Sequence, residues 1–117
     1  MKKVILLLVM LLVSLLAFPQ LNDGAKAKCK AYAKDKWGTN YSMVQYEYNK
    51  QVEAGNEFMI GYVRLGCFDK EPKDFSDECT IYLDAYAKWS DEYTGWVQWD
   101  MVLYEAKKQL EAYQNLK

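Results

Sequence analysis

The second half of this chain repeats the first. Residues Met43–Ala54 return as Met101–Ala112, a shift of 58 positions, and eight of the twelve residues are identical. A second match lies upstream, where Ala31–Lys34 returns as Ala85–Lys88 with a shift of 54. Such self-similarity is typical of a duplicated supersecondary unit. We therefore expect the chain to be built from two copies of one structural motif.

Each copy, over about residues 25–68 and 76–117, reads as two helices. Asn22 and Asp23 can cap a first helix that runs to about Lys36, and a second helix is expected to start near Ser42. Apolar residues then recur at i, i+4, i+8 and i+11, which predicts one buried stripe in each second helix. These positions are Val44, Tyr48, Val52 and Gly55 in the first copy, and Val102, Ala106, Leu110 and Tyr113 in the second.

The second copy is expected to begin near Ser76. Its first helix is expected to end at about Lys88 or Trp89, and its last helix to begin at Trp96 or Trp99. Residues 58–68 read as helix or as a short strand, and because a lone strand is unstable we favour helix, with a bend at Gly55. The predicted fold is all-α: two duplicated helical hairpins packed as a small four-helix domain over residues 21–117.

The N-terminus resembles an export signal. Two lysines precede an apolar run, residues 4–18, which is interrupted only by Ser14 and ends at Pro19. As a helix this run would span roughly 22 Å, less than the roughly 30 Å of a bilayer core. We expect residues 1–20 to be a cleaved signal peptide, with the cleavage site between 17 and 27, and the protein to be periplasmic or secreted in a bacterium. An uncleaved N-terminal membrane anchor is the alternative.

Three cysteines follow this segment. Cys67 and Cys79 flank a charged turn over residues 69–74, and we expect them to form a disulfide worth ~3 kcal/mol in the chain-entropy model. Cys29 is then left over as a free thiol, an intermolecular link or a small buried apolar residue. We favour the buried state, since unpaired cysteine packs well in cores.

The composition argues against an enzyme. The chain has no histidine, which removes Ser/His and Cys/His dyads and the commonest metal ligand. Glu47 and Glu105 are equivalent in the repeat, so a hydrolase with paired carboxylates is a remaining alternative. We favour instead a solvated helix face on which Glu47 pairs with Lys50 and Glu105 with Lys108. No cofactor or metal motif is present in the sequence.

The charge balance bears on partners. The net charge is −1 and becomes −3 once Lys2 and Lys3 are removed. Nucleic acid is not expected to bind at that charge, and a membrane would be contacted only through an uncleaved N-terminal segment.

Aromatic residues are the clearest excess, with ten Tyr and four Trp. Trp89, Tyr93, Trp96 and Trp99 crowd into eleven residues, a density that suits an aromatic binding surface for a protein partner or a sugar. For the cluster as a whole we favour the other interpretation, in which these rings fill the core, as we expect for Trp37 and Trp99, while Trp96 is expected to be exposed.

The segment that opens each second helix resembles a motif of small exported bacterial proteins whose function is unknown, K-W-x-x-D-Y-x-M-x-x-Y-C-x-x-x-Q-x-E-A-Y. The first copy matches it at Lys36-Trp37, Tyr41, Met43, Tyr46, Gln51 and Glu53-Ala54, and the second at Trp99, Met101, Tyr104, Gln109 and Glu111-Ala112-Tyr113. The motif's cysteine is Glu47 or Glu105 here, and its acid is Asn40 or Gln98. The resemblance implies a fold and an exported location, and no activity.

Together these features predict a non-catalytic, exported helical domain that binds an envelope or secreted protein. A carbohydrate or peptidoglycan binder that uses the aromatic surface is the first alternative, and a hydrolase using the two glutamates is the second.

Overall fold

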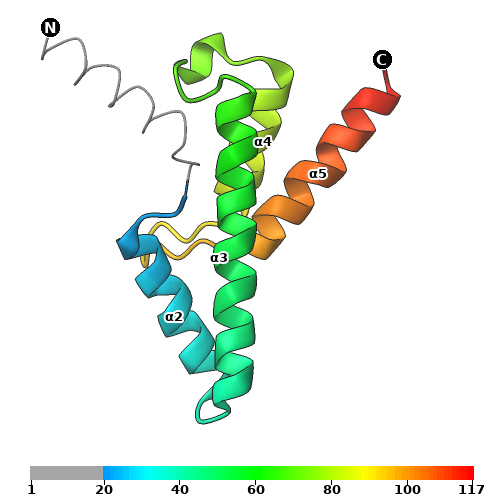
Figure 1. The fold of residues 1–117 in the computed structure, drawn as a ribbon. Coiled ribbons are helices and arrows are strands. Elements are labelled where there is room, and N and C mark those ends of the chain that lie inside the picture. The colour runs from blue at the N-terminus through cyan, green and yellow to red at the C-terminus, as the bar shows by residue number, and fades with distance from the viewer. Residues whose placement is uncertain (1–19) are drawn as a thin grey trace, which may run out of the picture.

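A computed structural model describes residues 20–117, where four α-helices and one 3-10 turn follow one another along the chain (Figure 1). The helices are α2 (Asp23–Trp37), α3 (Tyr41–Arg64), α4 (Asp77–Lys88) and α5 (Trp99–Asn115), and the 3-10 turn η1 is Pro72–Asp74. The predicted all-helical, four-helix domain is confirmed. Between residues 20 and 117, no helix has the length and apolar character needed to cross a membrane. The expected signal peptide lies, except for Gln20, outside the described residues.

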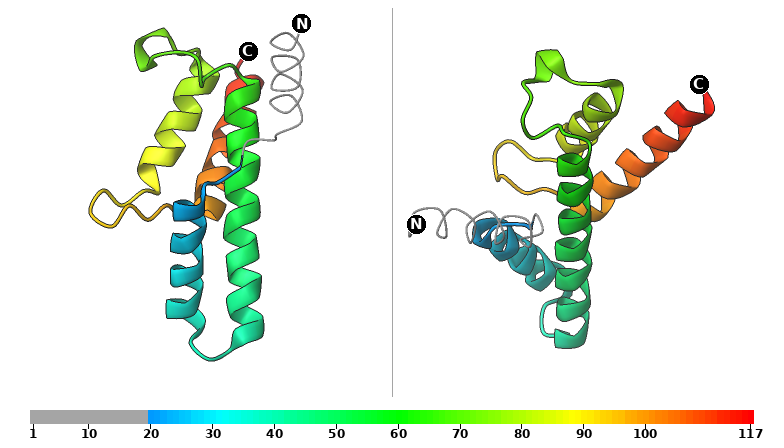
Figure 2. Two further views of the ribbon diagram at one scale, coloured as in Figure 1. Left: turned by 60° about the vertical axis from the view of Figure 1, so that its left-hand side comes forward. Right: turned by 45° about the horizontal axis from the view of Figure 1, so that its top comes forward.

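The long helix α3 organises the domain (Figures 1 and 2). Its first half packs against α2, while α5 starts near its middle and diverges from it toward the C-terminus. α4 packs in turn against α5, so that α2–α3 and α4–α5 are two hairpins joined where α3 meets α5. The duplicated hairpins expected from the sequence are therefore joined through their second helices.

Helix starts follow from capping residues. Three side chains accept a hydrogen bond from the backbone N–H three residues on, a contact worth about 1 kcal/mol at a helix N-terminus. They are Asn22 for α2 (2.8 Å), Asn40 for α3 (3.4 Å) and Ser76 for α4 (3.3 Å). Gly38, with a positive φ of 57°, ends α2 in the turn that the sequence predicted.

The prediction of helix for the ambiguous stretch after residue 58 is correct as far as Arg64, but the predicted bend at Gly55 is wrong. α3 is one continuous helix through that glycine (Figure 1). Gly55 serves the packing instead, because a Cβ there would lie 2.5 Å from the Cδ1 of Leu21. The absent side chain lets the segment that precedes α2 lie against α3.

The core sits between α3, α4 and the start of α5. Phe58 is its centre, with its ring 4.9 Å from that of Tyr82 and 5.8 Å from that of Trp99. Such aromatic pairs contribute about 0.5–1.5 kcal/mol each beyond their buried area. The core is composed of Leu21, Cys29, Ala54, Phe58, Tyr82, Ala85, Val97, Trp99, Val102 and Ala106.

The predicted apolar stripe of α3 is only partly correct. Val44 and Gly55 are buried, but Tyr48 and Val52 are half-buried, and Glu47 and Gln51 are buried between them. The helix is therefore turned so that two polar side chains face its neighbours.

The cysteines behave as expected. Cys67 and Cys79 form the predicted disulfide, which links the turn after α3 to the first turn of α4. Cys29 is unpaired and fully buried in α2, and burial raises the pKa of its thiol from 9.0 to about 11. The structure favours the buried state over an intermolecular link.

The Cys29 thiol should therefore be unreactive in the folded protein, because alkylation requires an accessible thiolate. With the disulfide intact, iodoacetamide at about pH 8 should leave the native chain unmodified, whereas the same treatment in denaturant should add one label per chain, as read by mass spectrometry. Equal labelling rates in the two states would contradict the burial of this thiol.

Candidate functional site

The connection between α4 and α5 folds into a closed loop, Ser90–Val97, which we call the aromatic loop. The N–H of Asp91 donates to the Trp96 carbonyl (2.8 Å), and the N–H of Gly95 donates to the Asp91 carbonyl (2.8 Å). The ammonium of Lys28, on α2, donates a hydrogen bond to the Thr94 carbonyl at 2.7 Å and so holds the loop against that helix. The loop is thus held at its base and along its side.

The side chain of Asp91 orders the tip of this loop. It accepts a hydrogen bond from the Tyr93 N–H at 2.9 Å, and this bond holds the pKa of the Asp91 carboxyl below its usual value. Tyr93 itself is 99% exposed. A large aromatic side chain therefore projects into solvent from backbone that is hydrogen-bonded on both sides.

The four aromatic residues predicted as a binding surface do not form one platform. Tyr93 is exposed, but Trp96 and Trp89 are half-buried and Trp99 is buried in the core. The expected exposure of Trp96 is only partly met, because Tyr32 stacks on its ring at 4.5 Å between centroids. Trp99 lies in the core as expected, where its ring packs against Phe58, so it adds nothing to an exposed aromatic surface.

Trp96 and Trp99 instead contribute to the wall of a pocket of about 580 Å³, which we call the aromatic pocket. The pocket lies between the start of α2, the C-terminal part of α3, α4, the aromatic loop and the start of α5, so both hairpins build it. Its size falls within the roughly 300–1,000 Å³ of small-ligand sites. Its apolar walls come from Leu21, Phe58, Met59, Tyr62, Leu83, Tyr86, Val97 and the two tryptophans, and its polar lining residues are Gln20, Asn22 and Lys28.

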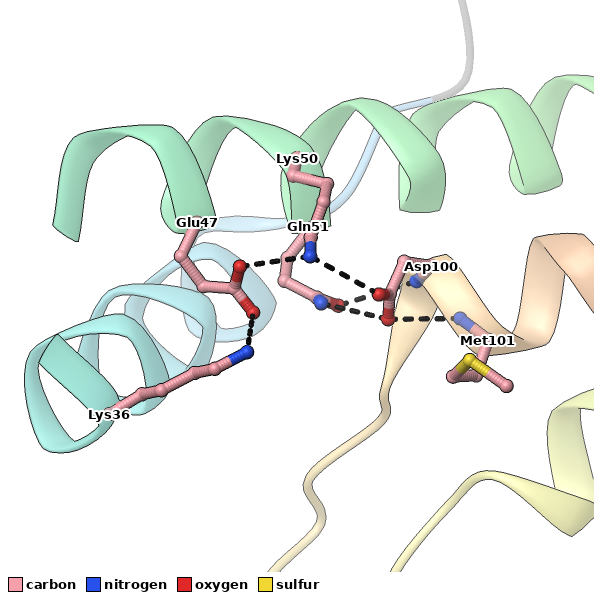
Figure 3. Close-up of polar contacts among 6 residues, drawn as sticks. All are labelled: Lys36, Glu47, Lys50, Gln51, Asp100 and Met101. Atoms are coloured by element: carbon pink, nitrogen blue, oxygen red, sulfur yellow. Dashed lines mark hydrogen bonds and ion pairs between the residues drawn. The ribbon is translucent and has the colours of Figure 1, made fainter. Parts of the chain in front are cut away.

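A buried polar network joins α2, α3 and α5 (Figure 3). The carboxylate of Glu47 is 3.2 Å from the Lys36 ammonium and 3.0 Å from the Lys50 ammonium, which also lies 3.5 Å from Asp100. The hydrogen bond to Glu47 is the main reason that the pKa of Lys50 is raised. Gln51 is fully buried like Glu47, and we call these two residues, together with their partly exposed partners Lys36, Lys50 and Asp100, the buried network.

Gln51 fixes where α5 begins. Its side-chain amide donates to the Asp100 carboxylate at 2.8 Å, and its carbonyl accepts from the Asp100 N–H at 3.4 Å. The Asp100 carboxylate also accepts from the Met101 N–H at 2.9 Å (Figure 3). Because Trp99 directly precedes Asp100, this contact also places Trp99 at the wall of the aromatic pocket.

The prediction that Glu47 and Glu105 lie on a solvated face is wrong for Glu47, which is 1% exposed. Glu105 is half-buried and pairs with Lys88 of α4 at 3.0 Å, not with the expected Lys108. The bond from Lys88 lowers the pKa of the Glu105 carboxyl. Each glutamate is therefore held by a lysine at a different helix junction, Glu47 between α2 and α3 and Glu105 between α4 and α5.

The two junctions share a feature that the sequence interpretation missed. A Lys-Trp dipeptide lies at the C-terminal boundary of both α2 (residues 36–37) and α4 (residues 88–89), and each lysine pairs with a glutamate of the following helix. Each ammonium also lies over the adjacent indole, at 5.6 Å for Lys36 and 5.8 Å for Lys88. The dipeptide was visible in the sequence, but its shift of 52 differs from the 54 and 58 of the other matches.

The unequal shifts have a simple structural origin. Between the shared Ala-Tyr-Ala-Lys and the tryptophan, the second copy is two residues shorter, and between that tryptophan and the next helix it is six residues longer. The longer connection is the aromatic loop. The starts of α3 and α5 nevertheless match, since Asn40 (φ −79°, ψ 80°) and Gln98 (φ −85°, ψ 85°) have nearly the same backbone conformation.

Within residues 20–117, no group of three or more Cys, Asp or Glu side chains is arranged to hold a metal ion. Comparisons of the chain with protein-family models, curated proteins and solved structures find no match. The resemblance to small exported bacterial proteins therefore stays a prediction.

The buried network predicts a difference between the two equivalent glutamates. Glu47→Gln removes the counter-charge of Lys36 and one of the two carboxylates beside Lys50, and should lower the free energy of unfolding by about 2–3 kcal/mol. Glu105→Gln should cost less, because Glu105 has one lysine partner and more contact with solvent. Urea denaturation of both variants measures this difference, and equal losses would contradict a special role for the buried network.

Proposed function

We propose that this protein is a non-catalytic, exported helical domain that binds a protein partner in the bacterial cell envelope through the aromatic loop and the aromatic pocket. One observation carries the proposal: a fully exposed Tyr93 stands on a hydrogen-bonded loop beside an apolar pocket of about 580 Å³. An exposed aromatic residue next to a concave apolar surface is the arrangement expected of a protein-binding hot spot.

The loop is suited to binding because its conformation is already set. The hydrogen bonds of Asp91 and the contact from Lys28 order the loop backbone before any partner arrives. Less conformational entropy is then lost on binding, so more of the contact energy of Tyr93 remains for affinity. Tyrosine itself adds large contact area with only two side-chain torsions to restrict.

The pocket supplies the complementary half of the contact. Met59 and Leu83 lie in its wall with the rings of Tyr86 and Trp96, a surface that suits an apolar side chain of a partner. Leu83 and Tyr86 are 37% and 38% exposed, so a partner can reach this wall from solvent.

Export is supported by the disulfide, since such bonds persist in oxidising compartments outside the cytoplasm. The apolar N-terminal run and the resemblance to small exported proteins support the same location. We therefore place the interaction in the periplasm or outside the cell.

A carbohydrate platform has less support. A sugar ring needs an open aromatic face with hydrogen-bonding groups around it, whereas Tyr32 stacks on Trp96, Trp99 is buried, and the pocket is mainly apolar.

Photo-cross-linking in intact cells tests the proposal. The full chain, with its own N-terminal segment, carries a photoreactive phenylalanine analogue at position 93. We expect one recurrent envelope protein to be cross-linked, because residue 93 lies at the centre of the proposed contact. The matched control places the same analogue at Tyr104, which is 59% exposed on α5 and lies outside the loop and the pocket.

With the partner purified, Tyr93→Ala and Leu83→Arg should each weaken binding at least about tenfold, as expected for hot-spot positions, while Tyr104→Ala should not. Cross-linking at residue 104 alone would contradict the proposed surface. Recovery of peptidoglycan fragments without a protein would favour the carbohydrate alternative.

A further inference from the structure

Positive charge is concentrated on one helix of this acidic protein. α2 contains five lysines and two aspartates, a net charge of +3, whereas residues 38–117 contain eight basic and fourteen acidic residues, a net charge of −6. The average charge of the chain conceals this asymmetry. The lysines of α2 are Lys26, Lys28, Lys30, Lys34 and Lys36.

Two of these lysines have structural roles and three do not. Lys28 donates to the aromatic loop and Lys36 pairs with Glu47. In the part of the chain that the structure describes, the ammonium groups of Lys26, Lys30 and Lys34 make no hydrogen bond or ion pair with another residue. Their spacing of four places them along one side of α2.

Lys30 and Lys34 also border a shallow groove of about 330 Å³ between α2 and α3. Its other lining residues, all on α3, are the buried Val44, the aromatic Tyr41 and Tyr48, and Gln45. Tyr41, the first residue of α3, is 73% exposed, so a large aromatic surface is accessible to solvent beside the lysines. This groove shares no residue with the aromatic pocket.

We propose that this groove binds an acidic segment of a polypeptide that also carries apolar side chains. Carboxylates of the segment pair with Lys30 and Lys34, and an apolar side chain lies over Val44 between the two tyrosines. The inference concerns a second surface and does not depend on binding at the aromatic pocket.

The chemistry favours a short acidic peptide over a dense polyanion. A nucleic acid or a sulfated polysaccharide gains affinity by neutralising many charges at once, and only three lysines are available here. The net charge of −6 over residues 38–117 also repels an extended polyanion. A peptide of mixed composition needs only the local positive charge, and its apolar side chains match the apolar residues that line the groove.

The test uses the protein purified after expression with its own N-terminal segment, and a fluorescein-labelled twelve-residue peptide made of four Glu-Leu-Ser units. Fluorescence anisotropy should show saturable binding that weakens by about tenfold between about 0.05 and 0.5 M salt. The neutral peptide of four Gln-Leu-Ser units should bind at least about tenfold more weakly, since it lacks the carboxylates.

Lys30→Glu/Lys34→Glu should reduce binding of the acidic peptide by at least about tenfold. Lys70→Glu/Lys108→Glu is the control, since it changes the net charge equally at exposed lysines outside the groove. Circular dichroism should show that both variants keep their helices.

Tyr41→Ala should weaken the acidic peptide a few-fold and leave its salt dependence unchanged. Equal losses in the two double variants, no binding of the acidic peptide, or tighter binding of polyglutamate or heparin than of the acidic peptide would each overturn the proposal.

Discussion

The buried contact between Gln51 and the start of α5 is the interaction on which the rest of the domain depends. Gln51 pairs with both the side chain and the backbone of Asp100, while Glu47, one turn earlier, holds Lys36 and Lys50. These contacts join α2, α3 and α5 at one place. Because the buried polar groups have partners, their desolvation is offset, and a displaced α5 would leave Gln51 unsatisfied. The buried network therefore specifies how the two hairpins are joined.

The difference between the two copies gives the domain its candidate binding surface. In both hairpins a Lys-Trp dipeptide follows or ends the first helix, and its lysine pairs with a glutamate on the second helix. The second copy then inserts the aromatic loop between its helices, and the loop lies against α2 of the first copy through Lys28. The two unequal copies thus line the aromatic pocket together: the first supplies the start of α2 and the C-terminal part of α3, and the second supplies α4, the loop and the start of α5.

Much of the local structure was predictable from the sequence because it depends on nearby residues. Asn22 and Ser76 cap helices, Gly38 permits a left-handed turn, and Cys67 pairs with Cys79 across a short charged segment. The burial of Glu47 was not predictable, because a Glu-Lys pair three residues apart also suits a solvated helix face. The bend expected at Gly55 was wrong because the glycine makes room for Leu21, and this contact between distant residues is not visible in the sequence.

The sequence by itself determined the helices, their duplication, the disulfide and the absence of histidine chemistry, because these follow from residue identity and short-range spacing. Tertiary structure decided which aromatic residues remain accessible. Tyr93 and Trp99 are six positions apart in one aromatic-rich segment, yet the first is fully exposed and the second lies in the core. That outcome depends on how α3 and α5 meet, and this contact is made between residues 49 positions apart.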